Sequence, residues 1–220
     1  CWRRPSSRWR SGSLSTPGVL CNDSQLLESG EGYRVEGDPT EAALLAAAAK
    51  AGILPEEAAR RWPRIDAIPF ESARQYMATL QDAGPGRPRM MYVKGSIESI
   101  CMDCSLGYGS DGSPAVVDSR EIHRVVEDMA AAGLRVLAFA RKEMPPDAVR
   151  IQHEDLAEGL QFIGLQGMID PPRPEALKAV QDCQRAGVLV KMITGDHAGT
   201  AAAIGRQLGL CREACALHTA

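Results

Sequence analysis

Hydrophobic positions along the chain switch between helical spacing and strand spacing, and the residues at each border mark where an element begins or ends. The segment GDPTEAALLAAAAKAG predicts a helix within 37–52. Asp38 or Thr40 can cap its start, and Pro39 suits the first turn. Glu41 favours the positive end of the helix dipole, and a glycine closes the helix. Both ends of this element are therefore marked in the sequence.

Strand-like alternation follows in RIDAIPFESARQYMATLQD, where Tyr76, Ala78 and Leu80 occupy every second position. The turn-rich segment AGPGRPR then leads back into MMYVKG, a second alternating run. Two such runs joined by a glycine- and proline-containing turn are typical of an antiparallel hairpin.

Helical spacing returns in SREIHRVVEDMAAAGLR, and the strand RVLAFARKEM follows it. The apolar stripe of this helix is formed by Ile122, Val125, Val126, Met129 and Ala130. We interpret His123, which lies in the same helix, as a surface histidine rather than a catalytic one.

The pattern changes character near 164–167. Downstream, LQFIGLQGMI and VLVKMITGD resemble strands, and each precedes a helical segment, DPPRPEALKAVQDCQRAG and HAGTAAAIGRQLGL. This order is typical of a parallel α/β sheet. Because such a sheet needs more strands to cover its faces, the last part of the chain is interpreted as a piece of a larger domain.

Composition places the chain among globular proteins, with 220 residues, 45% of them hydrophobic and 24% charged. A net charge of −3 and only 5% aromatic residues argue against nucleic acid as a partner. The longest apolar run, 42–54, contains Lys50 and is shorter than the roughly 20 residues that cross a bilayer. Residues 1–19 are basic and serine-rich, and we expect a disordered or cloning-derived arm, or one that contacts a membrane surface through its arginines and tryptophans.

Seven cysteines without a regular disulfide framework favour a reducing, cytosolic environment. Cys101, Cys104, Cys211 and Cys215 could together supply four thiolates to zinc. The glycines and basic residues that flank a zinc knuckle are missing, so we favour free cysteines packed as small core residues.

Two strand ends carry residues suited to an anion. In MYVKGSIE a strand ends on Lys94, and Gly95 can admit the close approach of a ligand, although a solvated lysine before a turn glycine fits the same pattern. In MITGD, Thr194, Gly195 and Asp196 stand between a strand and a helix, where α/β sheets bind phosphate.

Asp170 ends the preceding strand of this region. Together with Asp196 and a threonine hydroxyl it could hold Mg²⁺ and a phosphoryl group. The simpler interpretation is that Asp196 caps the next helix and Asp170 starts a turn.

Seven motifs, taken in order, give a more specific signal. They are CNDS (21–24), GDPTEAAL (37–44), PFESARQYM (69–77), YVKGSIE (92–98), GLRVLAFA (133–140), GMIDPPRPE (167–175) and MITGDH (192–197). In this order they resemble the cytosolic part of a P-type cation-transporting ATPase, in the calcium-pump-like branch.

The resemblance implies an α+β domain followed by part of an α/β domain. Residues 20–164 would form the nucleotide-binding domain, a twisted antiparallel sheet flanked by helices. Residues 165–220 would form a partial parallel βα fragment of the HAD-like phosphorylation domain. The parent would be a membrane pump, with this part at the cytoplasmic face and the remaining domains and membrane helices as its partners.

The resemblance also implies roles for single residues. Phe70 would stack on adenine, Glu41 would lie near the adenine edge, and Lys94 with Gly95 would line the deep end of the pocket. Arg135 and Leu137 match positions near the ribose and phosphates or the base. Asp170 and Arg173 match residues that link the nucleotide to the hinge, and Thr194, Gly195 and Asp196 match the loop that contacts the transferred phosphoryl group. ATP and its Mg²⁺ would be the cofactors, and we assign no metal-ligating residue in this sequence.

The sequence also departs from the family pattern. Gln75 stands where the family commonly has a lysine, which predicts weaker nucleotide affinity, and KGSIE replaces Lys-Gly-Ala-Pro-Glu. The printed sequence contains neither Asp-Lys-Thr-Gly-Thr nor Gly-Asp-Gly-x-Asn-Asp, so we expect it to bind ATP without forming an aspartyl phosphate alone. The alternatives are a free-standing HAD-like phosphatase, for which no nucleophilic aspartate is found, and a non-catalytic zinc or interaction module.

Overall fold

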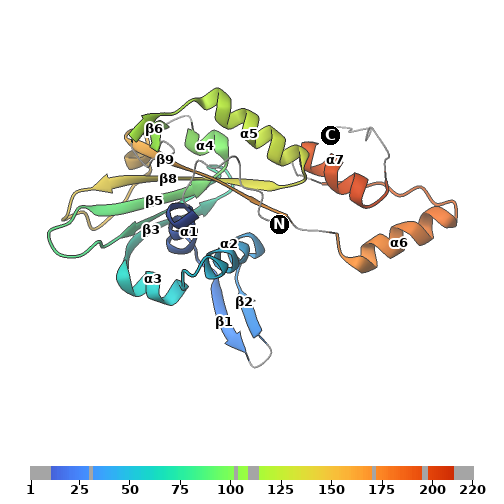
Figure 1. Cartoon of the computed structure of the whole chain (residues 1–220), viewed down its shortest axis with the longest axis horizontal. Helices are drawn as coiled ribbons and strands as arrows, with labels where there is room; N and C mark the ends of the chain where they lie inside the picture. Colours follow the sequence, from blue (N-terminus) through green and yellow to red (C-terminus); the bar gives the residue numbers. More distant parts are fainter. Residues whose placement is uncertain are drawn as a thin grey trace. The chain divides into compact units, whose positions relative to one another are not determined.

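The computed structural model describes residues 11–29, 32–101, 104–108, 114–169, 172–194 and 198–210 (Figure 1). The elements are α1 (Ser11–Leu20), β1 (Gln25–Ser29), β2 (Gly32–Glu36), α2 (Pro39–Lys50), α3 (Pro55–Arg61), β3 (Arg64–Glu71), β4 (Tyr76–Gln81), β5 (Arg89–Gly95), α4 (Ile97–Cys101), β6 (Cys104–Tyr108), β7 (Pro114–Val116), α5 (Ser119–Ala131), β8 (Arg135–Met144), the short 3₁₀ helix η1 (His153–Leu156), β9 (Leu160–Met168), α6 (Pro174–Arg185) and α7 (Ala198–Gln207). No helix in these ranges is long and apolar enough to cross a membrane.

A seven-stranded sheet in the order β3-β4-β5-β8-β9-β6-β7 forms the framework. The predicted hairpin is confirmed, because β4 and β5 pair antiparallel from Tyr76 opposite Gly95 to Gln81 opposite Met90. The sheet as a whole is mixed rather than purely antiparallel as we expected, since β6 pairs with β9 in parallel. A parallel pair needs a long connection, and β7, α5 and β8 lie between these two strands in the sequence.

The helix expected within 37–52 is confirmed as α2, and its cap is resolved. Asp38 is the N-cap, and its carboxylate accepts hydrogen bonds from the backbone N–H groups of Thr40 and Glu41. Pro39 occupies the first turn. The inward face of α2 buries Leu44 and Leu45, so its position is fixed by packing as well as by its cap.

The expectation of a disordered arm over 1–19 is wrong for residues 11–19, which belong to α1. Val19 and Leu20 are buried, and α1 contacts α2, α3 and β5. A serine-rich helix that contains Pro17 has poor local propensity, so its burial against the rest of the fold must stabilise it. Residues 1–10 lie outside the described ranges.

The described chain divides into two compact units, one with residues 11–119 and 137–166, the other with 120–136 and 167–210. In the first unit, β1 and β2 form a separate two-stranded hairpin that contacts α2 and extends away from the larger sheet in Figure 1. In the second, α5 and α7 lie close together, because a Cβ on Gly133 would come within 2.9 Å of the Ala203 side chain.

The predicted helices of the second unit are confirmed as α5, α6 and α7, but the predicted strand over VLVKMITGD is not found. Residues 188–194 form no strand, and Leu189 and Ile193 are 81% and 98% exposed. A strand gains its hydrogen bonds from a neighbouring strand, and none is paired with this segment in the described part of the chain.

Candidate functional site

A buried ion pair joins two of the residues that sequence analysis selected. Lys94, near the end of β5, contacts Glu41 Oε1 in the first turn of α2 through its ammonium. Only 6% of the lysine side chain and 15% of the glutamate side chain are exposed. Because two charges leave water together here, each depends on the other for compensation.

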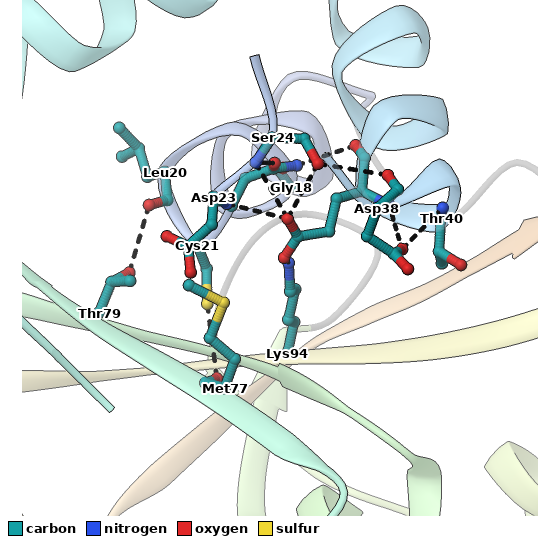
Figure 2. Close-up of polar contacts among 12 residues, drawn as sticks. Gly18, Leu20, Cys21, Asp23, Ser24, Asp38, Thr40, Met77, Thr79 and Lys94 are labelled. Atoms are coloured by element: carbon teal, nitrogen blue, oxygen red, sulfur yellow. Dashed lines mark hydrogen bonds and ion pairs between the residues drawn. The ribbon is translucent and has the colours of Figure 1, made fainter. Parts of the chain in front are cut away.

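The second oxygen of the Glu41 carboxylate faces the segment between α1 and β1. The backbone N–H groups of Asp23 and Ser24 lie 3.0 Å from Glu41 Oε2, and the Ser24 hydroxyl lies 3.1 Å from it. Figure 2 shows Lys94 rising from its strand toward this segment, with Asp38 and Thr40 beside it. The carboxylate is therefore held from both sides.

Asn22 supports the same segment with its whole side-chain amide. Its Nδ2 donates to the carbonyl oxygens of Gly18 and Glu41, each at 2.9 Å, and its Oδ1 accepts from the Ser24 N–H, also at 2.9 Å. The end of α1, the segment 22–24 and the start of α2 are thus tied together through one buried side chain.

Gly37 makes the close packing beside Ser24 possible. Its φ is +121°, a region that L side chains rarely adopt, and a Cβ at this position would lie 2.3 Å from Ser24 Oγ. The glycine before the Asp38 cap is therefore needed for conformation and for space.

Cys21 lies fully buried beneath this cluster, and its Sγ donates to the carbonyl of Met77 at 3.4 Å. Burial raises the pKa of Cys21 to about 11, and the nearby Lys94 charge opposes that shift. The group is therefore a protonated thiol at neutral pH, and such thiols are poor nucleophiles.

Gly95 follows Lys94 for a reason that differs from our expectation. A Cβ on Gly95 would lie 2.4 Å from the carbonyl oxygen of Gln75 and 2.8 Å from Tyr76 Cβ. The absence of a side chain thus admits the protein's own backbone at the start of β4. Gln75 itself has φ +57°, and its side chain is exposed.

Phe70 presents its ring to solvent, with 56% of the residue exposed. It lies where β3 is irregular, between the pairs Ile68–Ala78 and Glu71–Tyr76, and so beside Met77. Met77 is in turn the partner of Lys94 across β4 and β5, so these two residues share one face of the sheet, next to the irregular part of β3 that carries Phe70.

Leu137 is half-buried in β8, two residues before Phe139. Phe139 is the partner of Lys94 across β5 and β8. Since partners across strands and alternate residues along a strand share a face, Leu137 lies on the face of the sheet that carries Lys94.

The remaining selected residues belong to the other compact unit or lie outside the described residues. Arg135, Arg173 and Thr194 are exposed and belong to the other compact unit. Asp170, Gly195 and Asp196 lie outside the described residues, and their roles stay predictions.

His123 is exposed on α5, as expected of a surface histidine. Cys104 is buried, whereas the side chains of Cys101, Cys211 and Cys215 lie outside the described part, so the zinc hypothesis is not addressed there. Among the described residues no three His, Cys, Asp or Glu side chains gather as metal ligands would.

The sequence pattern assigned no role to Asn22, Ser24 or Arg64. Arg64 forms an ion pair with Asp23 at 2.6 Å and donates to the Leu20 carbonyl at 3.2 Å. A signal was present, because Asn22 and Ser24 belong to the CNDS motif, but the motif does not reveal that its amides face Glu41.

The chain is similar in sequence to a known family and to several known proteins. The family model for the P-type ATPase cytoplasmic domain N matches residues 11–175. A cation-transporting ATPase, pma1, of Synechocystis sp. is 55% identical over 89% of this chain and 21% of its own length. A probable cation-transporting ATPase F of Mycobacterium tuberculosis is 42% identical over 88% of the chain and 21% of its own length. A calcium-transporting ATPase of Bacillus subtilis is 36% identical over 88% and 22% respectively.

The chain thus spans about a fifth of the length of these relatives. The family match starts with the first residue of α1 and includes the whole cluster around Glu41 and Lys94. On these grounds the chain belongs to the P-type ATPase family and corresponds to the cytoplasmic N domain of its cation-transporting members.

Proposed function

We propose that this chain is the ATP-binding cytosolic part of a cation-transporting P-type ATPase. The observation that carries the proposal is the exposed Phe70 in the irregular part of β3, next to the strand whose Met77 is the partner of Lys94, with Glu41 paired to that lysine. It combines an exposed aromatic ring with a carboxylate acceptor and an ammonium donor in one region of the sheet. Binding of nucleotide by the N domain also agrees with the family to which the chain belongs.

These groups suit the chemistry of an adenine nucleotide. The Phe70 ring offers a flat apolar surface for the base, and stacking of this kind is worth about 1 to 3 kcal/mol. Glu41 is an acceptor for an exocyclic amine, and Lys94 is a donor for ring nitrogens or ribose oxygens. Leu137 contributes an apolar contact on the same face of the sheet. Gly95 lets the end of β5 pack closely against the start of β4.

The phosphate end of the nucleotide belongs, in this proposal, to the second unit and to residues outside the printed sequence. Arg135 lies near the ribose and phosphates, and Asp170 with Arg173 links the nucleotide to the hinge. Thr194, Gly195 and Asp196 contact the transferred phosphoryl group. Mg²⁺ enters bound to the phosphates, where it neutralises their charge during phosphoryl transfer.

The proposed domain boundary lies between residues 164 and 165. Residues 20–164 form the nucleotide-binding domain, to which the preceding residues of α1 are added. Residues 165–220 form part of the phosphorylation domain. In the complete pump the nucleotide-binding domain positions ATP for transfer to an aspartate beyond this sequence, at the cytoplasmic face of a membrane. That transfer is coupled to ion transport through membrane helices.

Calorimetric titration of ATP with Mg²⁺ tests this proposal. We expect saturable binding, a roughly tenfold weaker Kd for Phe70→Ala, and an unchanged melting temperature, because an exposed ring contributes little to folding. Leu54→Ala, which truncates another exposed apolar side chain at 47% exposure, is the matched control and should leave the Kd unchanged.

Failure of the wild-type chain to bind ATP would contradict the proposal. ATP turnover by the chain, followed in the same samples, would instead favour the free-standing phosphatase. Stoichiometric zinc in a metal analysis would favour the zinc module.

A further inference from the structure

Segment 22–24 surrounds the Glu41 carboxylate without being one of the residues selected for ligand contact. We propose that Asn22 and Ser24 are positioning residues, which fix Glu41, and through it Lys94, in the orientation that a nucleotide requires. The proposal rests on the proposed function, because it assigns how the same site is held in place.

The first argument comes from the hydrogen-bond capacity of the carboxylate. Each carboxylate oxygen offers about two lone-pair sites. Glu41 Oε2 already meets the N–H groups of Asp23 and Ser24 at 3.0 Å and the Ser24 hydroxyl at 3.1 Å. Its capacity is filled by the protein, so a ligand donor is directed to Oε1, which has Lys94 as its one partner among the described residues.

The Ser24 hydroxyl has a second acceptor within reach. Its oxygen lies 3.2 Å from the Asp38 carbonyl at the N-cap of α2 and 3.1 Å from Glu41 Oε2. Gly37 supplies the space for this contact, since any side chain there would collide with Ser24. The hydroxyl therefore joins the segment to the first turn of α2, whichever of the two oxygens receives its single proton.

Asn22 holds the backbone of Ser24 and the backbone of Glu41 in place. It accepts from the Ser24 N–H, which also faces Glu41, and it donates to the Glu41 carbonyl. A side chain that is 7% exposed and uses all its polar atoms has one favourable orientation. The segment and the glutamate are therefore set relative to one another before any ligand arrives, which lowers the ordering cost of binding.

The test compares Ser24→Ala and Asn22→Ala with the wild-type chain. Loss of the Ser24 hydroxyl should weaken ATP binding about fivefold, and loss of the Asn22 amide should weaken it more, because more hydrogen bonds are lost. Ser15→Ala, which truncates another buried serine of 3% exposure, is the matched control and should not change the Kd. If Asn22→Ala fails to fold, Ser24→Ala still decides the question.

A double-mutant cycle separates positioning from general destabilisation. If Ser24 acts through Glu41, then Ser24→Ala should have little further effect on ATP binding in a Glu41→Gln background. Additive effects of the two substitutions would overturn the proposal, because the hydroxyl would then act independently of the glutamate.

Amide hydrogen exchange gives a readout that needs no nucleotide. In Ser24→Ala the Asp23 amide should exchange roughly fivefold faster as Glu41 loosens, while amides of β4 and β5 keep their rates. If the wild-type chain does not bind ATP but this exchange effect appears, the proposed function fails and the positioning role stands. An unchanged Asp23 rate in Ser24→Ala would overturn the positioning role, whatever the nucleotide does.

Discussion

The buried pair of Glu41 and Lys94 and the exposed Phe70 with its adjacent turn lie in opposite environments, although only β4 separates Lys94 in β5 from Phe70 in β3. The ion pair is buried, and its Glu41 carboxylate is held by Lys94 and by three donors from Asp23 and Ser24. Phe70 is exposed by more than half, and Gln75 is also exposed. Two residues assigned to one ligand can therefore contribute differently to the stability of the fold. A substitution in the buried pair should cost stability and binding together, whereas one at Phe70 should cost binding alone.

The largest expected effect is that of Lys94→Ala. It leaves the Glu41 carboxylate buried without its cation, and breaking a buried pair in this way costs about 3 kcal/mol or more of the free energy of unfolding. Urea denaturation monitored by circular dichroism measures the loss. Lys50→Ala, at the exposed end of α2, is the control and should change stability by less than about 0.5 kcal/mol. If the Lys94→Ala protein were as stable as the Phe70→Ala protein, the expected difference in stability between the two regions would be wrong.

Gly95→Ala tests the place where the end of β5, next to Lys94, packs against the exposed turn before β4. The new Cβ would meet the Gln75 carbonyl at 2.4 Å and force the start of β4 away, which should cost about 2 kcal/mol. Gly18→Ala is the matched control, because the nearest atom to its Cβ would lie at an ordinary 3.6 Å. If Gly95→Ala lost ATP binding with no loss of stability, the glycine would serve the ligand rather than the backbone.

The pH dependence of the unfolding free energy tests the burial of the Cys21 thiol beneath the ion pair. Because burial raises the pKa of Cys21 from 9.0 to about 11, the folded state holds this proton more tightly than the unfolded state does. The resulting stabilisation is complete below pH 9 and is lost as the pH rises toward 11, at about 1.4 kcal/mol per pH unit. Comparing the unfolding free energy of the wild type and Cys21→Ala from pH 7 to 11 should give a shallower alkaline slope for the variant. Equal slopes would mean that Cys21 does not carry this dependence.

The smallest effect belongs to the exposed side. Gln75 holds a left-handed backbone at φ +57°, which glycine adopts without strain. Gln75→Gly should therefore raise stability by about 0.5 kcal/mol, after the greater flexibility of glycine in the unfolded chain is subtracted. Arg74→Gly, whose backbone is not left-handed, should lower stability instead. Thermal denaturation of both variants decides between these signs.

Much of the fold could be predicted from local pattern. The α2 helix carries its own cap, proline and closing glycine, and the β4–β5 hairpin carries its alternation and turn residues. Local signals failed where tertiary contacts override propensity. α1 is a poor helix by composition yet is buried, and residues 188–194 are strongly apolar yet form no strand.

For the candidate site, the sequence by itself determined which residue types stand in which motif, because motif order and family resemblance are properties of the chain. Its seven ordered motifs pointed to the P-type ATPase family, and that resemblance pointed to Glu41, Phe70 and Lys94. Only the tertiary structure decided that Glu41 and Lys94 form a buried pair, since their 53-residue separation carries no contact information. It also decided that Asn22 and Ser24 fix this pair and that Gly95 accommodates backbone, because hydrogen bonding and close packing depend on which segments folding brings together.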